Sequence, residues 1–419
     1  MNSTRKLRQG LGIALFAATL AGCGIPAATS LVGQGDASLA ARGAGAHWGM
    51  YNFFALDNDL DNGTGLISSM LRVNAPNVVH ASLYDGESQG DSQIFYQNQP
   101  NDRLTATAKT EVDSGTAKAL EDFLAKATQT SPGKARMLTM ADHGGGIIRG
   151  ICSDWNGPGG KKIIHVNEVN DVLARYPVEI LGFDACFMSM VEVAYEVRQN
   201  AKFVVGAQTT TRGDFPYASL VQSLDRNLDS RRAAVSVMEA AHANARYTHA
   251  FSVLDTAGSA QVAAAMGDLG KVMTAKMGTM KEPMREAIAK AQSYANETSP
   301  GLSMYNNYRD LGDVVDRLAA LGDPDLARAA KGVRAALARC VVAEKHANGG
   351  WGGGDPDLER ISGAMIYAST DGTVEQKYLS RSFARDSGWG DVLVKLNSRA
   401  GWANPVQKDK YPFGFPSKR

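Results

Sequence analysis

The 419-residue sequence carries almost no net charge and has no long block of one sign. Its 44 lysines and arginines are balanced by 43 acidic residues, which leaves a formal charge of +1, and no run of five or more like charges occurs. A protein that binds nucleic acid through its phosphates needs a basic stripe or patch. The composition therefore indicates no nucleic-acid partner.

Cysteine is scarce, and the common metal-binding spacings are missing. The four cysteines include no Cys-x-x-Cys pair and the seven histidines no His-Glu-x-x-His, so a catalytic zinc site is not indicated. We expect no metal ligands and no required cofactor. Calcium stays open, because Asp57, Asp59 and Asp61 form a carboxylate-rich loop, although this loop lacks the glycine and glutamate of an EF-hand.

The N-terminal apolar stretch is too short to span a bilayer. Lys6 and Arg8 precede Leu11–Ala21, which has the length of a signal-peptide core. The stretch ends in Leu-Ala-Gly-Cys, which resembles a bacterial lipobox and implies cleavage before Cys23 and acylation of that residue. An ordinary secretory signal is the alternative. We predict a signal peptide over 1–22, a tether over 23–46, and a lipid-anchored protein of the bacterial cell envelope that faces the periplasm or the exterior.

The next part of the chain alternates between strand and helix patterns. Apolar runs predict strands, and the spacing of Leu120, Phe123 and Leu124 predicts an amphipathic helix over 116–127. Asn167 is a candidate cap for a second helix, and a third is expected over 189–199. Such alternation is typical of an α/β fold, with a mostly parallel central sheet covered by helices on both faces. The predicted strands cover 47–56, 77–83, 135–141, 178–183 and 203–207.

The C-terminal half has a different composition. From about 218 to 347 it is rich in alanine, methionine, leucine, arginine and lysine at helical spacing, and a glycine-rich loop then leads to a strand over 361–369. We divide the folded chain into a catalytic core (47–217), a mostly helical region (218–347), a closing strand and helix (348–400) and a tail (401–419). The sequence does not show whether the helical region is a separate domain or contributes to the first sheet.

A histidine and a cysteine follow two of the predicted strands. His143 comes after one apolar run and Cys186 after the next, and functional groups in open α/β sheets collect at the carboxyl ends of strands. A thiol near an imidazole becomes a good nucleophile at neutral pH. Gly144–Gly146 would let a substrate carbonyl approach backbone amides. Each residue alone is more often structural, but the combination favours a catalytic pair.

These residues resemble the clostripain family of cysteine peptidases, relatives of caspases, gingipains and legumains. The resemblance rests on DHGGG at 142–146, DACFMSMVEVAYEV at 184–197 and GDFPY at 213–217, and extends from about residue 48 to 396. It implies a caspase-like α/β/α sandwich. It also implies that Cys186 attacks the peptide carbonyl, that His143 protonates the leaving amine, and that the amides of Gly144 and Cys186 form the oxyanion hole.

The resemblance further implies cleavage after arginine or lysine, which requires an acid in the S1 pocket. Asp184 and Asp214 are the candidates, because a buried carboxylate can pair with a basic P1 side chain. Asp184 could instead cap the following helix, and Asp214 could be an ordinary turn residue. We expect protein or peptide substrates with basic P1 residues.

Family members also cut themselves between the histidine and cysteine blocks. Arg149, Lys161 and Lys162 lie there, in a glycine-rich segment that we expect to be exposed, and Arg149 is the best-placed candidate; basic residues that merely solvate a loop are the alternative. Cys152 and Cys340 could form a disulfide. The predicted function is thus an envelope-anchored cysteine endopeptidase, and the alternative is an inactive caspase-like lipoprotein that acts as a binding or adhesion module.

Overall fold

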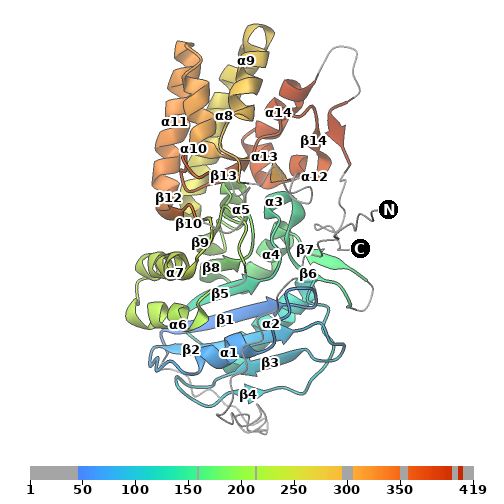
Figure 1. The fold of residues 1–419 in the computed structure, drawn as a ribbon, viewed down its shortest axis with the longest axis vertical. Helices are drawn as coiled ribbons and strands as arrows, with labels where there is room; N and C mark the ends of the chain where they lie inside the picture. The colour runs from blue at the N-terminus through green and yellow to red at the C-terminus, as the bar shows by residue number, and fades with distance from the viewer. Residues whose placement is uncertain are drawn as a thin grey trace, which may run out of the picture.

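A central sheet organises the protein. The computed structural model describes residues 46–157, 160–212, 215–294, 305–349, 357–398 and 404–408. Within this part of the chain, nine strands form one sheet in the order β12-β10-β9-β8-β5-β1-β2-β3-β4 (Figure 1). The five strands from β9 to β2 are parallel, and the strands beyond them at both edges are antiparallel. The strands are β1 (Trp48–Ala55), β2 (Val78–Asp85), β3 (Gln93–Tyr96), β4 (Thr105–Ala106), β5 (Ala135–Ala141), β8 (Val178–Asp184), β9 (Ala201–Ala207), β10 (His249–Asp255) and β12 (Val341–Ala347).

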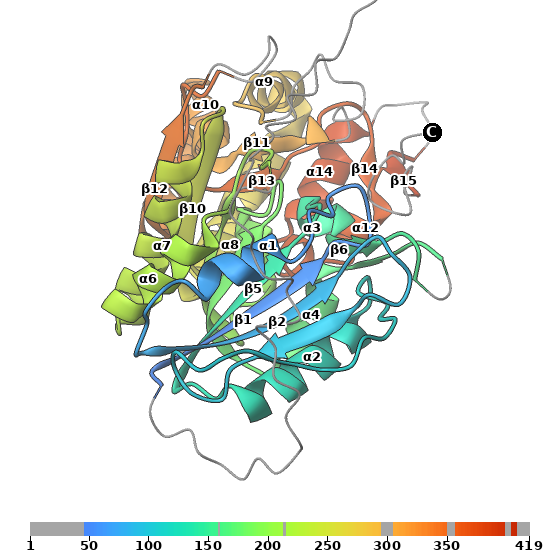
Figure 2. The ribbon, with the colours of Figure 1, turned by 60° about the horizontal axis from the view of Figure 1, so that its bottom comes forward.

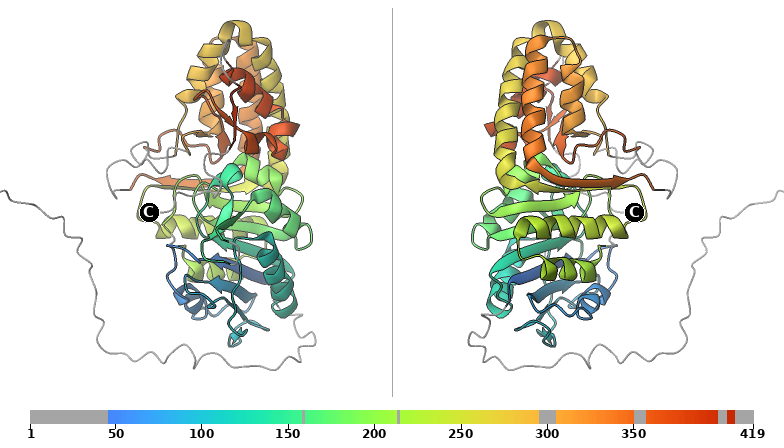
Figure 3. Two further views of the ribbon diagram at one scale, coloured as in Figure 1. Left: turned by 90° about the vertical axis from the view of Figure 1, so that its right-hand side faces the viewer. Right: turned by 90° about the vertical axis from the view of Figure 1, so that its left-hand side faces the viewer.

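Helices cover both faces of this sheet. α1 (Gly65–Met70), α6 (Tyr217–Arg226) and α7 (Ser230–Asn244) pack on one face, and α2 (Ala117–Thr130), α4 (Val166–Leu173), α5 (Val191–Glu196) and α8 (Thr256–Ala275) contribute to the core on the other (Figure 3). α2 and α4 lie side by side (Figure 2). β1 and β2 are buried along their whole length, as expected for strands covered on both faces. The predicted α/β/α sandwich is confirmed.

The helical region also extends the sheet. α9 (Met277–Ala289), α10 (Leu311–Ala319) and α11 (Pro324–Cys340) pack with α8 in the upper part of Figure 1. Within the same region, β10 and β12 add two strands to the central sheet. Because β10 and β12 belong to the central sheet, the helical region is continuous with the first core. These two strands are hard to recognise in the sequence, since alanine-rich helices lie on either side of them.

The chain closes with short elements beside the sheet. β11 (Tyr308–Asp310) pairs with β13 (Met365–Tyr367), and β14 (Val374–Glu375) pairs with β15 (Val406–Gln407). α12 (Gln376–Leu379), α13 (Ser382–Asp386) and α14 (Trp389–Asn397) follow β14. The strand expected over 361–369 is therefore shorter than predicted, and it lies outside the central sheet.

Two local predictions are wrong in detail. The helix assigned to an Asn167 cap begins two residues earlier, at Val166, with His165 as its N-cap; the Glu168 carboxylate accepts a hydrogen bond from the His165 amide at 2.8 Å. The Asn167 side chain instead accepts a hydrogen bond from Arg381. The third helix covers only Val191–Glu196, because the residues after Cys186 form a buried turn first.

Residues 1–45 lie outside the described residues, so the predicted signal peptide, Cys23 and most of the tether are not seen. In the part of the chain that is described, no helix combines the length and the apolar character needed to cross a bilayer. Cys152, Cys186 and Cys340 are free thiols, and no disulfide joins Cys152 to Cys340.

Candidate active site

His143 and Cys186 follow neighbouring parallel strands. In the register of β5 and β8, Ala141 pairs with Asp184, and His143 and Cys186 each lie two residues beyond that pair. The contact is close: a Cβ atom on Gly144 would lie 2.3 Å from the carbonyl oxygen of Cys186. Only glycine allows this approach of two backbones. The two blocks singled out in the sequence therefore meet at one edge of the sheet.

The Cys186 thiol is held by the loop after β9. The amide of Thr211 donates a hydrogen bond to Sγ at 3.2 Å, and Sγ lies 3.7 Å from the carbonyl oxygen of Thr211. Burial raises the pKa of Cys186, and the hydrogen bonds from Thr211 oppose that rise. The following residue, Phe187, has a φ of 59°, the left-handed region that non-glycine residues rarely adopt. The thiol thus sits on a sharp turn and needs a base to become a thiolate.

The His143 imidazole is oriented by Asp59, which belongs to the carboxylate-rich loop seen in the sequence, and by Trp155, which no sequence pattern indicated. Its Nε2 lies 2.8 Å from Oδ1 of Asp59, in the loop after β1. Its ring stacks on that of Trp155, with centroids 6.0 Å apart and planes 6° from parallel. Asp59 is 84 residues away in the chain, and its place among three alternating acids after a predicted strand did not indicate His143 as its partner.

Asp142 anchors the strand end that carries His143. This buried carboxylate accepts hydrogen bonds from the side chain of Asn58 at 2.8 Å and from the hydroxyl and amide of Ser153. Burial raises the pKa of Asp142 to about 6. The network joins β5 to β6 (Ile151–Asp154) and to the loop after β1.

Asp184 ends β8 two residues before Cys186. It exposes only 5% of its surface, and Oδ2 accepts a hydrogen bond from the Tyr217 hydroxyl at 3.1 Å. The alternative that it caps the next helix is wrong: α5 begins at Val191, with Met190 as its N-cap. Asp214, the other S1 candidate, lies outside the described residues.

The three basic residues between the blocks have different surroundings. Arg149 lies in α3 (Gly146–Arg149), is 4% exposed and pairs with Glu375 at 2.5 Å, so the expectation that it is exposed is wrong. Lys162, in β7 (Lys162–Ile164), pairs with Asp113. Nζ of Lys161 lies 3.7 Å from the centroid of the Trp155 ring, the ring that stacks on His143.

The C-terminal segments support the glycine loop after His143. The Tyr308 hydroxyl donates a hydrogen bond to the carbonyl oxygen of Gly145 at 2.7 Å. Glu375 holds Arg149 at the end of the same loop. Tyr305 stacks on Phe187, with ring centroids 4.5 Å apart. The closing part of the chain therefore packs directly against the site.

Buried carboxylates gather beside the site as well. Asp57, Asp85 and Asp154 lie close together, and burial raises the pKa of Asp57 to about 6 and that of Asp85 to about 7. The other two acids of the expected carboxylate loop are engaged elsewhere: Asp59 with His143, and Asp61 with the Tyr84 hydroxyl at 2.6 Å.

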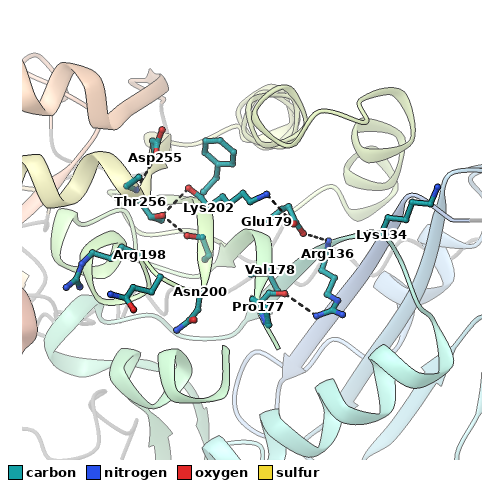
Figure 4. Close-up of a pocket in the computed structure, with 14 residues that line it drawn as sticks. Lys134, Arg136, Pro177, Val178, Glu179, Arg198, Asn200, Lys202, Asp255 and Thr256 are labelled. Atoms are coloured by element: carbon teal, nitrogen blue, oxygen red, sulfur yellow. Dashed lines mark hydrogen bonds and ion pairs between the residues drawn. The ribbon is translucent and has the colours of Figure 1, made fainter. Parts of the chain in front are cut away.

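A separate pocket lies at the other end of the parallel strands, away from His143 and Cys186. Figure 4 shows its lining residues from the starts of β5, β8 and β9 and the end of β10, among them Lys134, Glu179, Lys202 and Asp255. The Lys202 ammonium lies 3.5 Å from Glu179. This pocket is at the amino ends of the parallel strands, whereas His143 and Cys186 follow the carboxyl ends, so it is not part of the candidate active site.

A caspase-like sandwich with a histidine and a cysteine beyond the ends of neighbouring parallel strands defines a class, the caspase-like cysteine peptidases. The model of the Clostripain family matches residues 52–396. The chain therefore belongs to the clostripain family and is a cysteine peptidase.

Individual relatives agree with this assignment. Over 107 residues the chain is 31% identical to clostripain from Hathewaya histolytica, a match that covers 23% of this chain and only 20% of clostripain. The fold is similar to that of a secreted C11 cysteine protease from Bacteroides thetaiotaomicron in complex with an irreversible peptide inhibitor, with a TM-score of 0.66 at 17% identity over 82% of this chain and 99% of that one. It is also similar to an inactive zymogen C11 protease from Parabacteroides distasonis, with a TM-score of 0.62 at 18% identity over 82% and 98%.

Proposed function

We propose that this protein is an endopeptidase that cleaves after arginine or lysine with Cys186 as nucleophile and His143 as base. One observation carries the proposal: the backbones of the His143 and Cys186 blocks touch at Gly144, with the buried Asp184 two residues from the nucleophile. The missing side chain of Gly144 lets the two loops that carry the proposed reacting groups come into contact.

The proposed reaction proceeds in two stages, acylation of Cys186 and hydrolysis of the acyl-enzyme. The thiolate of Cys186 attacks the carbonyl carbon, and the oxyanion that forms is bound by the amides of Gly144 and Cys186. Protonated His143 gives its proton to the leaving nitrogen as the C–N bond breaks, which leaves a thioester. Water, deprotonated by His143, then attacks the thioester; the C–S bond breaks, which releases the carboxylic acid product and restores the Cys186 thiolate and protonated His143.

Asp59 acts in this scheme as a positioning residue. Its hydrogen bond engages Nε2 of His143, so Nδ1 is the nitrogen that exchanges protons with the thiol and the leaving amine. Stacking on Trp155 restricts rotation of the ring. A base that is already held in the correct orientation speeds the reaction, because the entropic cost of aligning it no longer adds to the activation barrier.

Asp184 provides the proposed selectivity for basic P1 side chains. A guanidinium or ammonium group can pair with its carboxylate, whereas an uncharged P1 side chain cannot form such a pair. The Tyr217 hydroxyl holds the carboxylate in place from α6.

Turnover of fluorogenic peptides tests the proposal. The purified protein is assayed on matched peptides with arginine, lysine or alanine at P1, beside Cys186→Ala and beside Cys340→Ala, which removes a buried thiol outside the site. We expect hydrolysis of the basic peptides by the wild type and by Cys340→Ala alone. A silent wild type that also fails to react with a thiol-directed label bearing arginine would refute the proposal and favour the binding-module alternative.

We further propose that the chain cuts itself between the histidine and cysteine blocks, after Lys161. Its ammonium group lies on the Trp155 ring beside His143, whereas Arg149 is buried and ion-paired. Mass spectrometry of the purified chain should find a cut after Lys161 in the wild type and in Lys162→Gln. The cut should be missing in Lys161→Gln and in Cys186→Ala, and a cut after Arg149 would contradict the assignment.

For the N-terminus we propose lipid anchoring at Cys23, on the strength of the Leu-Ala-Gly-Cys sequence after the apolar stretch. Metabolic labelling with a fatty acid should mark the wild-type protein and leave Cys23→Ala unlabelled, and only the wild type should fractionate with membranes. A labelled Cys23→Ala variant would place the acyl group elsewhere.

A further inference from the structure

A line of buried hydrogen bonds runs from the segment beside Cys186 into the helical region. Nε2 of Gln208 donates to the Tyr294 hydroxyl, and this hydroxyl donates to Oδ2 of Asp310 at 2.7 Å. These three side chains, which we call the polar bridge, expose at most 1% of their surface. Because an ionised carboxylate only accepts hydrogen bonds, the direction of both bonds in the polar bridge is fixed.

One end of the polar bridge lies in the segment that supports Cys186. Gln208 follows β9 directly. The next residue, Thr209, accepts a hydrogen bond through its carbonyl oxygen from the amide of Phe187 at 3.1 Å. Two residues further on, the amide of Thr211 donates to Sγ of Cys186 at 3.2 Å. This segment therefore holds both the thiol and the sharp turn that follows it.

The Gln208 side chain makes no other hydrogen bond in the described part of the protein. Its Oε1 atom is buried and has no partner there, so only the bond from Nε2 to Tyr294 fixes the side-chain amide. A buried amide that loses its last partner is costly, because water cannot reach it to replace the bond. The position of this side chain thus depends on the Tyr294 hydroxyl.

The other end of the polar bridge is rigid. Besides its bond from Tyr294, the Asp310 carboxylate accepts hydrogen bonds from the amide of Asp313 at 2.9 Å and from the amide and hydroxyl of Ser362 at 2.8 and 2.7 Å. Asp310 ends β11 and is the N-cap of α10. This carboxylate cannot shift without losing several bonds, so it is a fixed point in the helical region.

We propose that the polar bridge positions the Cys186 thiol by fixing the amide of Thr211 against Sγ. The inference rests on the proposed role of Cys186 as the nucleophile. A hydrogen bond from an amide stabilises the thiolate more than the thiol, so it favours the reactive form. A donor that is already in place when charge develops costs no reorganisation during the reaction.

Other influences on the thiol remain the same when the polar bridge is altered. Burial raises the pKa of Cys186, the hydrogen bonds from Thr211 lower it, and the carboxylates of Asp184 and Asp142 raise it further. Variants of the polar bridge keep both carboxylates and the proposed base His143. A change in the ionisation of the thiol then reports on the contact with Thr211.

Alkylation of the thiol tests this inference without a peptide substrate. The full chain is treated with iodoacetamide at a series of pH values, and mass spectrometry measures the rate at Cys186. That residue is partly exposed, whereas Cys152 and Cys340 are buried. Tyr294→Phe removes only the hydroxyl. It should raise the apparent pKa of Cys186 by roughly one pH unit, which slows alkylation at neutral pH by up to about tenfold.

A matched variant distinguishes positioning from a purely structural role. Tyr51→Phe also removes a buried hydroxyl, which donates to the carbonyl oxygen of Ser131 at 3.0 Å in the segment that leads into β5. Both substitutions should lower the unfolding temperature, but only Tyr294→Phe should move the pH profile of alkylation. In peptide turnover, Tyr294→Phe should lower kcat and leave KM nearly unchanged.

A second variant breaks the polar bridge from its other end. Gln208→Met removes the donor and leaves the bond between Tyr294 and Asp310 intact. It should give the same shift as Tyr294→Phe, and the double variant should add little, because both changes cut one connection. Gln208→Met also supplies the readout if Tyr294→Phe does not fold.

The outcomes separate this inference from the proposed function. Alkylation profiles of Tyr294→Phe and Gln208→Met that coincide with those of the wild type and Tyr51→Phe would overturn the inference and leave the polar bridge as part of the core. A shifted profile in a protein that hydrolyses no peptide would refute the peptidase proposal, whereas the positioning of the thiol would stand.

Discussion

Replacing Asp184 with asparagine tests the proposed origin of selectivity. The substitution keeps the size of the side chain and a hydrogen-bond acceptor for Tyr217, but it removes the negative charge. Since Asp184 is only 5% exposed, water cannot replace that charge for a bound arginine side chain. The substitution therefore isolates the electrostatic part of P1 recognition.

The expected magnitude follows from this burial. Removing one partner of a buried charge pair at an interface costs about 2 to 5 kcal/mol, because the other charge is left unpaired. Since each 1.36 kcal/mol is tenfold in rate, kcat/KM for the arginine peptide should fall by roughly 30- to 5,000-fold. A matched peptide with alanine at P1 makes no such pair and should change little.

The assay is the ratio of kcat/KM for the arginine and alanine peptides, measured for wild type, Asp184→Asn and Tyr217→Phe. Tyr217→Phe keeps the charge and loses one hydrogen bond, so its ratio should fall far less. If Asp184→Asn keeps the wild-type ratio, the reasoning is refuted, and the S1 acid must be sought elsewhere, with Asp214 as the next candidate.

Three further predictions concern the site and the core. Gly144→Ala should lower kcat/KM by roughly a hundredfold in a folded protein, because the new Cβ would lie 2.3 Å from the Cys186 carbonyl oxygen; full activity in the peptide assay would contradict the close approach. Asp59→Asn should lower kcat by roughly tenfold or more with little change in KM, and an unchanged kcat would remove Asp59 from the mechanism. Burial lowers the pKa of His80 from its usual 6.5 to about 4. The unfolded chain therefore binds a proton that the folded chain refuses, and stability should fall as the pH drops from about 6.5 to 4, by at most about 3 kcal/mol. Urea unfolding at several pH values should show this loss, and His80→Leu should show less of it.

Much of the sheet could be predicted because its parallel strands are buried on both faces. Continuous apolar runs such as Trp48–Ala55 and Val178–Asp184 stand out from the helical spacing around them, and the carboxyl ends of such strands meet at one edge. That rule alone brought His143 and Cys186 together.

The remaining parts depend on contacts that a linear pattern does not contain. β10 and β12 lie among alanine-rich helices and pair with strands distant in sequence, so their surroundings conceal them. Asp59 acquires its role only through a partner 84 residues away. Asn167 has the residue type of a good helix cap, but in the folded protein its side chain accepts a hydrogen bond from the distant Arg381. The cap is therefore His165, which the local sequence does not favour.

The supports of the glycine loop come late in the chain. Tyr308 and Glu375 contact this loop from positions 163 and 226 residues beyond their partners Gly145 and Arg149. A chain still on the ribosome has completed both His143 and Cys186 long before either support exists. The proposed peptidase activity is thereby tied to completion of synthesis, because truncated products that retain His143 and Cys186 lack the side chains that brace the glycine loop between them.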